Sequence, residues 1–138
     1  MAADFVDSHS RHFDDANHLF SINRYANADQ LYGFSVECGL KSLMMAFGMP
    51  FDQNRQVPQN YPDRVHADGV WSRYESYRSA HARGANYILS NSNPFNNWNA
   101  SQRYENQSSY NIGTVTPHRD AAEQVRQLVK KAQLEGLI

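Results

Sequence analysis

Residues 26–48 read ANADQLYGFSVECGLKSLMMAFG, and this stretch decides the expected architecture. Apolar side chains occur around almost the whole circumference of a helix with this sequence, which places the helix at the centre of a bundle. The stretch also contains Glu37 and Lys41, four residues apart, and charges inside a core are costly unless they are paired. We therefore predict a central helix that carries an internal polar spot.

Other helices are predicted on both sides of the central one from their apolar periodicity. The first spans about residues 3–24, and the link at residues 25–27 is so short that it implies an antiparallel hairpin with the central helix, residues 26–48. After a proline-containing loop over residues 50–68, an apolar stripe predicts a third helix over residues 68–90.

A long polar segment, residues 91–113, precedes the final predicted helix. A loop of this length is often functional, and this one is expected either to be irregular or to contain a short fifth helix near Trp98–Tyr104. Thr116 can cap the last helix, residues 117–135, with Pro117 at its first position. No stretch alternates in the manner of a strand, so the predicted fold class is an all-α, antiparallel bundle of four main helices.

The composition fits one domain over residues 1–138 and gives no sign of a strongly charged partner. A net charge of −1 provides no general attraction for DNA, RNA or an anionic membrane. Cys38 is the single cysteine and cannot form an internal disulfide, so we expect a reducing compartment. The sequence contains no secretory signal, no membrane span of ~20 apolar residues and no phosphate-binding glycine motif. We expect a soluble cytoplasmic domain without a metal or other cofactor.

Three segments carry a resemblance to a known family. ADQLYGFSVECGLKSLM, residues 28–44, resembles the second helix of HEPN domains, which are small helical-bundle proteins of prokaryotic defence and toxin–antitoxin systems. The preceding residues 12–28 resemble the first HEPN helix with its tight turn, and WNASQRY, residues 98–104, resembles an element found after the third helix in some members. The resemblance implies a HEPN bundle, usually a homodimer, that binds RNA or a cognate protein or cleaves RNA without a metal.

The catalytic element of that family is an arginine followed four to six residues later by a histidine near the start of a late helix. In such a pair the histidine acts on the ribose 2′-hydroxyl and the arginine neutralises the phosphate. Here Arg103 and Arg119 have no histidine in range, and seven residues separate Arg73 from His81. Arg11 and His18, with six residues between them, fit the count but lie in the first helix. We therefore expect a module without the usual catalytic spacing.

Two groups of residues are candidates for binding. Glu37 and Lys41 can pair along the helix. They form either a structural pair from which Lys41 reaches solvent, or a polar pocket in which Glu37 holds an arginine of another helix or of a dimer mate. His66, in the loop before the third helix, is an accessible titratable group.

The second group lies in the segment 91–113. Trp98 and Tyr104, with other aromatic residues of this segment, could stack on RNA bases while Arg103 meets a phosphate. In the interpretation that we favour, Trp98 and Tyr104 cover the end of the bundle and Arg103 pairs with Glu37 or another acid.

The sequence also suggests structural roles for three other histidines and leaves three candidate functions. His9, His12 and His81 are interpreted as hydrogen-bonded core or interface residues. The preferred function is a HEPN-like, RNA-related homodimeric module of a defence or toxin–antitoxin system. The alternatives are a metal-independent endoribonuclease with a rearranged Arg/His site, and a small-ligand or nucleotide-binding bundle with its pocket near Glu37.

Overall fold

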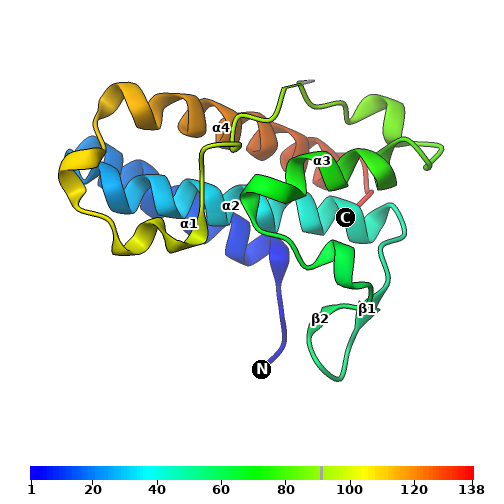
Figure 1. Cartoon of the computed structure of the whole chain (residues 1–138). Coiled ribbons are helices and arrows are strands. Elements are labelled where there is room, and N and C mark those ends of the chain that lie inside the picture. Colours follow the sequence, from blue (N-terminus) through cyan, green and yellow to red (C-terminus); the bar gives the residue numbers. More distant parts are fainter. Residues whose placement is uncertain (91) are drawn as a thin grey trace.

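The structure is a computed structural model that describes residues 1–90 and 92–138, and it confirms the predicted all-α bundle (Figure 1). The four main helices are α1 (Phe5–Ser21), α2 (Tyr25–Ala46), α3 (Ala67–Arg78) and α4 (Ile112–Leu134). None of the helices in the described part of the chain is both long and apolar enough to span a membrane.

Helices α1 and α2 form the predicted antiparallel hairpin, although both are shorter than expected. Asp4 is the N-cap of α1, and its side chain accepts a hydrogen bond from the Asp7 backbone amide. At the turn, Asn23 adopts a left-handed conformation with φ of 63°, which asparagine tolerates better than most residues. The Tyr32 hydroxyl donates to Asn17 Oδ1 at 2.6 Å and so ties the two helices together along their length.

Helix α2 is the central helix, as its sequence predicts. It contacts α1, α3 and α4, and its buried residues occur on all sides. Gly33 is required for this packing because a Cβ there would lie 2.1 Å from the Trp98 ring. The core therefore depends on a close approach between α2 and the segment 92–110, which is distant in sequence.

The predicted third helix, residues 68–90, is longer than the observed one, because α3 ends at Arg78. Beyond that residue the chain turns back, and Arg78 donates to the Gly84 carbonyl at 3.1 Å. The turn is so tight that a Cβ on Gly84 would lie 1.8 Å from the Arg78 carbonyl oxygen. Tyr87 then packs into the core outside any α-helix, whereas Ile88 is 58% exposed, although apolar periodicity over residues 68–90 would put its side chain on the inner face of a continuous helix.

Helix α4 begins five residues earlier than predicted, at Ile112 instead of 117. Its cap is Asn111 and not Thr116, since the Asn111 side chain accepts from the Thr114 amide and Thr114 in turn accepts from the Asn111 amide. Pro117 lies inside the helix near its start. A proline there removes one backbone hydrogen bond at the N-terminal end and leaves the rest of the helix intact.

Two further departures concern the connecting segments. The loop after α2, predicted without strands, contains the short antiparallel pair β1 (Phe51–Asp52) and β2 (Val57–Pro58), followed by a 3-10 helix at Tyr61–Asp63. Another 3-10 turn lies at Gly84–Asn86.

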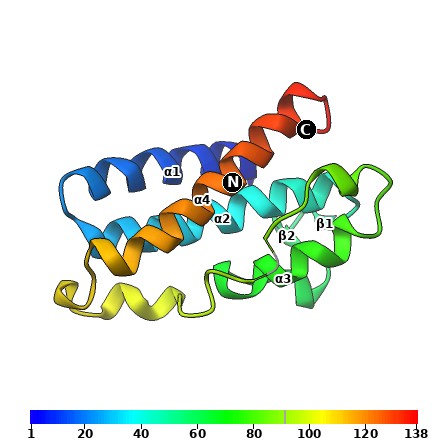
Figure 2. The same cartoon turned by 90° about the horizontal axis from the view of Figure 1, so that it is seen from above.

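The segment predicted as a long polar loop begins with Asn91, which lies outside the described residues. From residue 92 it runs beside α2 to the opposite end of the bundle (Figure 2). It contains 3-10 helices at Ala100–Tyr104 and Gln107–Ser109. The first of these lies within the short fifth helix considered near Trp98–Tyr104.

Candidate functional site

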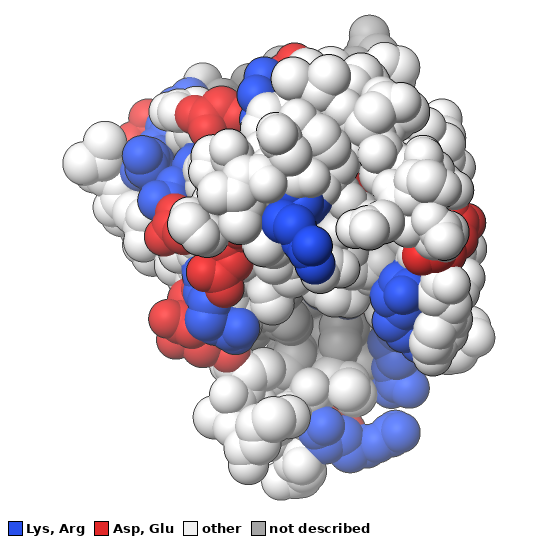
Figure 3. Space-filling model, turned by 90° about the vertical axis from the view of Figure 1, so that its left-hand side faces the viewer, with Lys and Arg blue, Asp and Glu red and all other residues white. Residues whose placement is uncertain are grey.

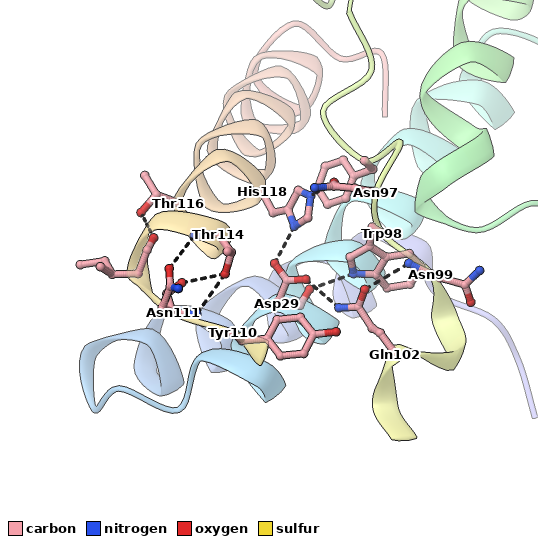
Figure 4. A network of polar contacts seen from close by, with 12 residues as sticks. Asp29, Asn97, Trp98, Asn99, Gln102, Tyr110, Asn111, Thr114, Thr116 and His118 are labelled. Atoms are coloured by element: carbon pink, nitrogen blue, oxygen red, sulfur yellow. Dashed lines mark hydrogen bonds and ion pairs between the residues drawn. The ribbon is translucent and has the colours of Figure 1, made fainter. Parts of the chain in front are cut away.

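A buried carboxylate, Asp29, lies where α2, α4 and the segment 92–110 meet (Figure 4). Its Oδ1 accepts a hydrogen bond from His118 Nδ1 at 2.5 Å, and its Oδ2 accepts one from Gln102 Nε2 at 2.6 Å. The backbone carbonyl of the same residue accepts from Trp98 Nε1 at 3.0 Å. A charge this deeply buried is stable only with such partners.

The His118 imidazole is fixed on three sides. Besides the bond to Asp29, its Nε2 lies 2.8 Å from Asn97 Oδ1. The Phe95 ring stacks on the imidazole with a centroid distance of 4.7 Å and an interplanar angle of 14°. The histidine is consequently a positioned group with both ring nitrogens engaged.

This network forms the floor of a cleft of about 220 Å³, which we call the polar cleft. Its walls carry amide, hydroxyl and carboxylate groups and one aromatic ring. They are Asn97, Asn99, Glu105, Ser109, Tyr110 and Thr114, above the floor residues Asp29, Gln102 and His118. Converging polar groups of this kind fix the orientation of a ligand in a concave binding site.

Tyr110 and Glu105 are joined by a hydrogen bond on the wall of the cleft. The Tyr110 hydroxyl donates to Glu105 Oε2 at 2.9 Å. Burial raises the pKa of Tyr110 above its usual value, and the hydrogen bond to the Glu105 carboxylate raises it further. The phenol therefore stays a hydrogen-bond donor and holds the carboxylate in place.

A smaller hollow of about 130 Å³ adjoins the polar cleft and shares Gln102 and Glu105 with it. Arg24 and Arg103 line this Arg24–Arg103 hollow. Within residues 1–90 and 92–138, the Arg24 guanidinium pairs with no carboxylate. Arg103 packs over the ring of Tyr104 at 4.6 Å, and that ring is 78% exposed. The hollow thus offers two cations beside an accessible aromatic face.

The end of the bundle that carries the segment 100–110 is viewed face-on in Figure 3. Lys and Arg side chains there are interspersed with Asp and Glu side chains, and the charges do not separate into one basic field. An anionic ligand on this end would therefore be held by individual arginines and not by a broad positive potential.

Glu37, Lys41 and His66, which the sequence singled out, lie together in a second cluster. Glu37 accepts from Lys41 Nζ at 2.8 Å and from His66 Nδ1 at 3.0 Å. The Lys41 side chain is only 7% exposed, so it does not reach solvent as one interpretation expected. Arg103 does not join this cluster, because it donates instead to the Ala100 carbonyl at 2.5 Å.

The polar cleft does not lie beside Glu37, where a ligand pocket was expected. Asp29 precedes Glu37 by eight residues, which is roughly 12 Å along the axis of α2. Trp98 is 1% exposed and belongs to the core, whereas Arg103 and Tyr104 remain at the surface. Arg103 and Tyr104 are therefore accessible to RNA, and Trp98 is not.

The other predicted residues lie apart from the polar cleft. Arg11 and His18 are both exposed on α1, and Arg11 lies 3.6 Å from Asp7. His81 lies beyond α3 with its ring 5.1 Å from that of Phe47.

His9, Cys38 and His12 belong to the interface between α1 and α2. His9 is fully buried and its Nδ1 donates to the Ser35 carbonyl at 2.8 Å. Burial lowers the pKa of His9, lowers that of His12 and raises that of the Cys38 thiol to about 12. Such a thiol is inert at neutral pH.

Asp29 and His118, the two central residues of the cleft, are not among the site residues predicted from the sequence. One signal for Asp29 was present, since it is a charged residue near the start of a mostly apolar helix. His118 shares a helical face with Ala121, Val125 and Val129, which placed it on the inner stripe of α4. Neither signal indicates which residue pairs with which.

A larger hollow of about 410 Å³ lies elsewhere, between the start of α1, the end of α2 and the C-terminal residues. Its lining is mostly apolar, with Phe5, Val6, Met45, Phe51 and Leu137 among its residues. Because converging polar groups are what orient a ligand, we place the candidate site in the polar cleft.

Among the described residues, no three His, Cys, Asp or Glu side chains are grouped so that they could hold a metal ion. Comparisons with models of known protein families, with curated proteins and with solved structures found no match.

Proposed function

We propose that this chain is a HEPN-like helical module that binds single-stranded RNA at the polar cleft and the adjoining Arg24–Arg103 hollow. The observation that carries the proposal is that Arg24 and Arg103 line a hollow that shares two residues with the polar cleft, while the exposed Tyr104 ring lies against Arg103. Proteins that bind unpaired RNA combine an exposed aromatic ring for stacking with cations for the phosphates. In keeping with the family resemblance, we propose a homodimer in a prokaryotic defence or toxin–antitoxin-type system.

The arrangement favours a single strand over a duplex. Tyr104 is 78% exposed and can stack only on a base that is not already stacked within a helix. With charges interspersed on this end of the bundle, electrostatics alone would give weak binding. Stacking and local arginine contacts together would then provide most of the affinity.

The test is binding of a fluorescent single-stranded RNA by anisotropy, at low salt and with EDTA present. We expect Arg103→Ala and Tyr104→Ala each to weaken binding by roughly tenfold, because base–aromatic stacking contributes about 1–3 kcal/mol. The chain offers matched controls in Arg55 and Tyr61, which is 82% exposed, on the loop between α2 and α3. Equal losses with Arg55→Ala and Tyr61→Ala would refute this surface as the RNA site.

One observation favours cleavage as a second candidate function, namely the His118–Asp29 pair at the floor of the cleft. A histidine oriented by a buried carboxylate is the usual form of a general base. In a metal-independent endoribonuclease it would remove the proton from a ribose 2′-hydroxyl, whose oxygen then attacks the adjacent phosphorus. A 2′,3′-cyclic phosphate forms, and the bond to the 5′-oxygen breaks as that oxygen takes a proton from water and leaves as a hydroxyl. His118 is only 3% exposed and its Nε2 lies against the Asn97 side-chain oxygen, which accepts a hydrogen bond only from a protonated Nε2. A role as base therefore requires both that Asn97 turn aside and that Nε2 carry a lone pair.

Cleavage is tested separately from binding, with purified protein, total RNA and EDTA. The enzymatic function requires cleavage that is abolished in His118→Gln and that persists in the exposed control His18→Gln. Binding without cleavage would leave the chain as a non-catalytic RNA-binding module.

A further inference from the structure

The polar cleft contains groups that are already satisfied and groups that are still available to a ligand. Asp29 uses both side-chain oxygens, for His118 and Gln102. The Gln102 side-chain oxygen also accepts from the Asn99 backbone amide at 3.1 Å. These residues form a closed network, so the floor of the cleft offers few groups for recognising a ligand.

The walls, in contrast, present two donors and one acceptor. Asn97 and Asn99 each have the side-chain oxygen engaged, by His118 and by Ser101, so that each amide NH₂ is left for a ligand. Glu105 accepts the Tyr110 hydroxyl through Oε2, which keeps a second lone pair, and its Oε1 is available. None of these three available groups has a hydrogen bond within the described chain.

From this pattern we infer that the polar cleft binds a guanine base through its Watson–Crick edge. A carboxylate accepts two parallel hydrogen bonds from two adjacent donors, and guanine presents such a pair in its N1–H and N2–H₂ groups. The guanine O6 beside them is an acceptor and suits an asparagine NH₂ group. Glu105 would therefore read N1 and N2, and Asn97 or Asn99 would donate to O6.

The other three bases fit this set of groups less well. Adenine and cytosine place a ring-nitrogen lone pair beside their amino group, and a carboxylate repels that lone pair. Uracil offers one donor between two acceptors. A base that covers these polar groups and leaves them unpaired is rejected more strongly than one that merely loses contact area.

The inference rests on the proposed RNA function and adds sequence preference to it. The Arg24–Arg103 hollow shares Glu105 with the cleft, so a phosphate attached to the bound guanosine can meet an arginine there. The recognised chemistry is the guanine edge, which a guanosine within RNA and a free guanine nucleotide have in common.

The first experiment compares four fluorescent RNA octamers that consist of uridine except for one central G, A, C or U. We expect the wild-type chain to prefer the G octamer by about tenfold or more, since a bidentate base contact is worth about that much. In Glu105→Gln the preference should disappear, because the amide has only one acceptor oxygen. Glu123→Gln is the matched control on α4, outside the cleft, and should keep the preference.

A second variant tests whether Tyr110 positions the Glu105 carboxylate for its contact with guanine. Tyr110→Phe keeps the ring and removes the hydroxyl that holds Glu105. Its preference for G should fall between those of wild type and Glu105→Gln. Circular dichroism of each variant checks that the fold is retained, which is expected because Glu105 is exposed.

The second experiment measures the cleft without RNA, by titrating GMP and AMP into ¹⁵N-labelled protein. GMP should shift the Asn97 and Asn99 side-chain amide signals and AMP should shift them less. Equal binding of all four octamers would overturn the guanine inference and leave the RNA function standing. Absence of RNA binding together with a GMP-specific shift would overturn the RNA function alone, and absence of both would overturn the two proposals together.

Discussion

The Asp29 carboxylate and the His118 imidazole lie 2.5 Å apart although they are 89 positions apart in the chain. The pair joins the beginning of α2 to the beginning of α4, and the two side chains are only 2% and 4% exposed. In so dry an environment each group depends on the other, because water cannot replace a lost partner. The pair therefore links the stability of the bundle to the architecture of the polar cleft.

We predict that Asp29→Ala and His118→Ala each lower the free energy of unfolding by about 3–5 kcal/mol. The double variant should lose less than the sum of the two, by about 1–3 kcal/mol, because the second replacement removes a group that has already lost its partner. Urea unfolding followed by circular dichroism measures all three. Asp29→Ala combined with Asp120→Ala, at an exposed position of α4, should be additive within error. Additive losses for Asp29 and His118 as well would show that the two groups are not coupled.

The Glu37–Lys41 pair gives a second prediction, with an exposed pair as its control. Removing the negative charge in Glu37→Gln leaves the ammonium of Lys41, whose side chain is 7% exposed, without its carboxylate. We expect a loss of about 3 kcal/mol in the free energy of unfolding. Asp7→Asn removes the same charge from the exposed pair with Arg11 and should cost less than about 1 kcal/mol. Equal effects of the two variants would contradict the buried geometry.

Gly33 gives a prediction about packing. A methyl group at this position would lie 2.1 Å from the Trp98 ring, so Gly33→Ala must displace the indole or α2. We expect a loss of about 1–3 kcal/mol despite the higher helix propensity of alanine. The intrinsic fluorescence of the chain should also change, because the indole NH bonds the Asp29 carbonyl in the native position. A stability gain would mean that the indole does not lie on Gly33.

The sequence was sufficient to predict the features that depend on local pattern. The apolar circumference of residues 26–48 indicates a central helix, and the short link before it indicates a hairpin. The spacing of Glu37 and Lys41 predicts their pairing, since side chains four apart lie on one face of a helix. The end of α3 could not be predicted in this way. It depends on Arg78 reaching the Gly84 carbonyl and on Tyr87 packing into the core.

The candidate site was less predictable because its residues come from three separate parts of the chain. Periodicity places Asp29 and His118 on inner faces, but no local pattern indicates that those faces meet. The burial of Trp98 likewise could not be predicted from the residues around it in the sequence. Its polar neighbours are compatible with an exposed base-stacking residue, whereas the gap above Gly33 admits the indole to the core.

The last prediction concerns the dependence of stability on pH. Burial lowers the pKa of His9 below the usual histidine value of about 6.5, with the hydrogen bond to the Ser35 carbonyl opposing part of that shift. As the pH falls below about 6.5, the unfolded chain takes up this proton before the folded chain does. The stability provided by neutral His9 is therefore complete above that pH and is lost as the pH falls toward the folded-state pKa.

The loss can reach about 1.4 kcal/mol for each pH unit in that window. We expect His9→Gln to reduce the slope of unfolding free energy against pH between pH 7 and pH 5. A residual slope should remain, because burial also lowers the pKa of His12. Urea unfolding at half-unit pH intervals measures both slopes. An unchanged slope in His9→Gln would contradict the lowered pKa that burial gives His9.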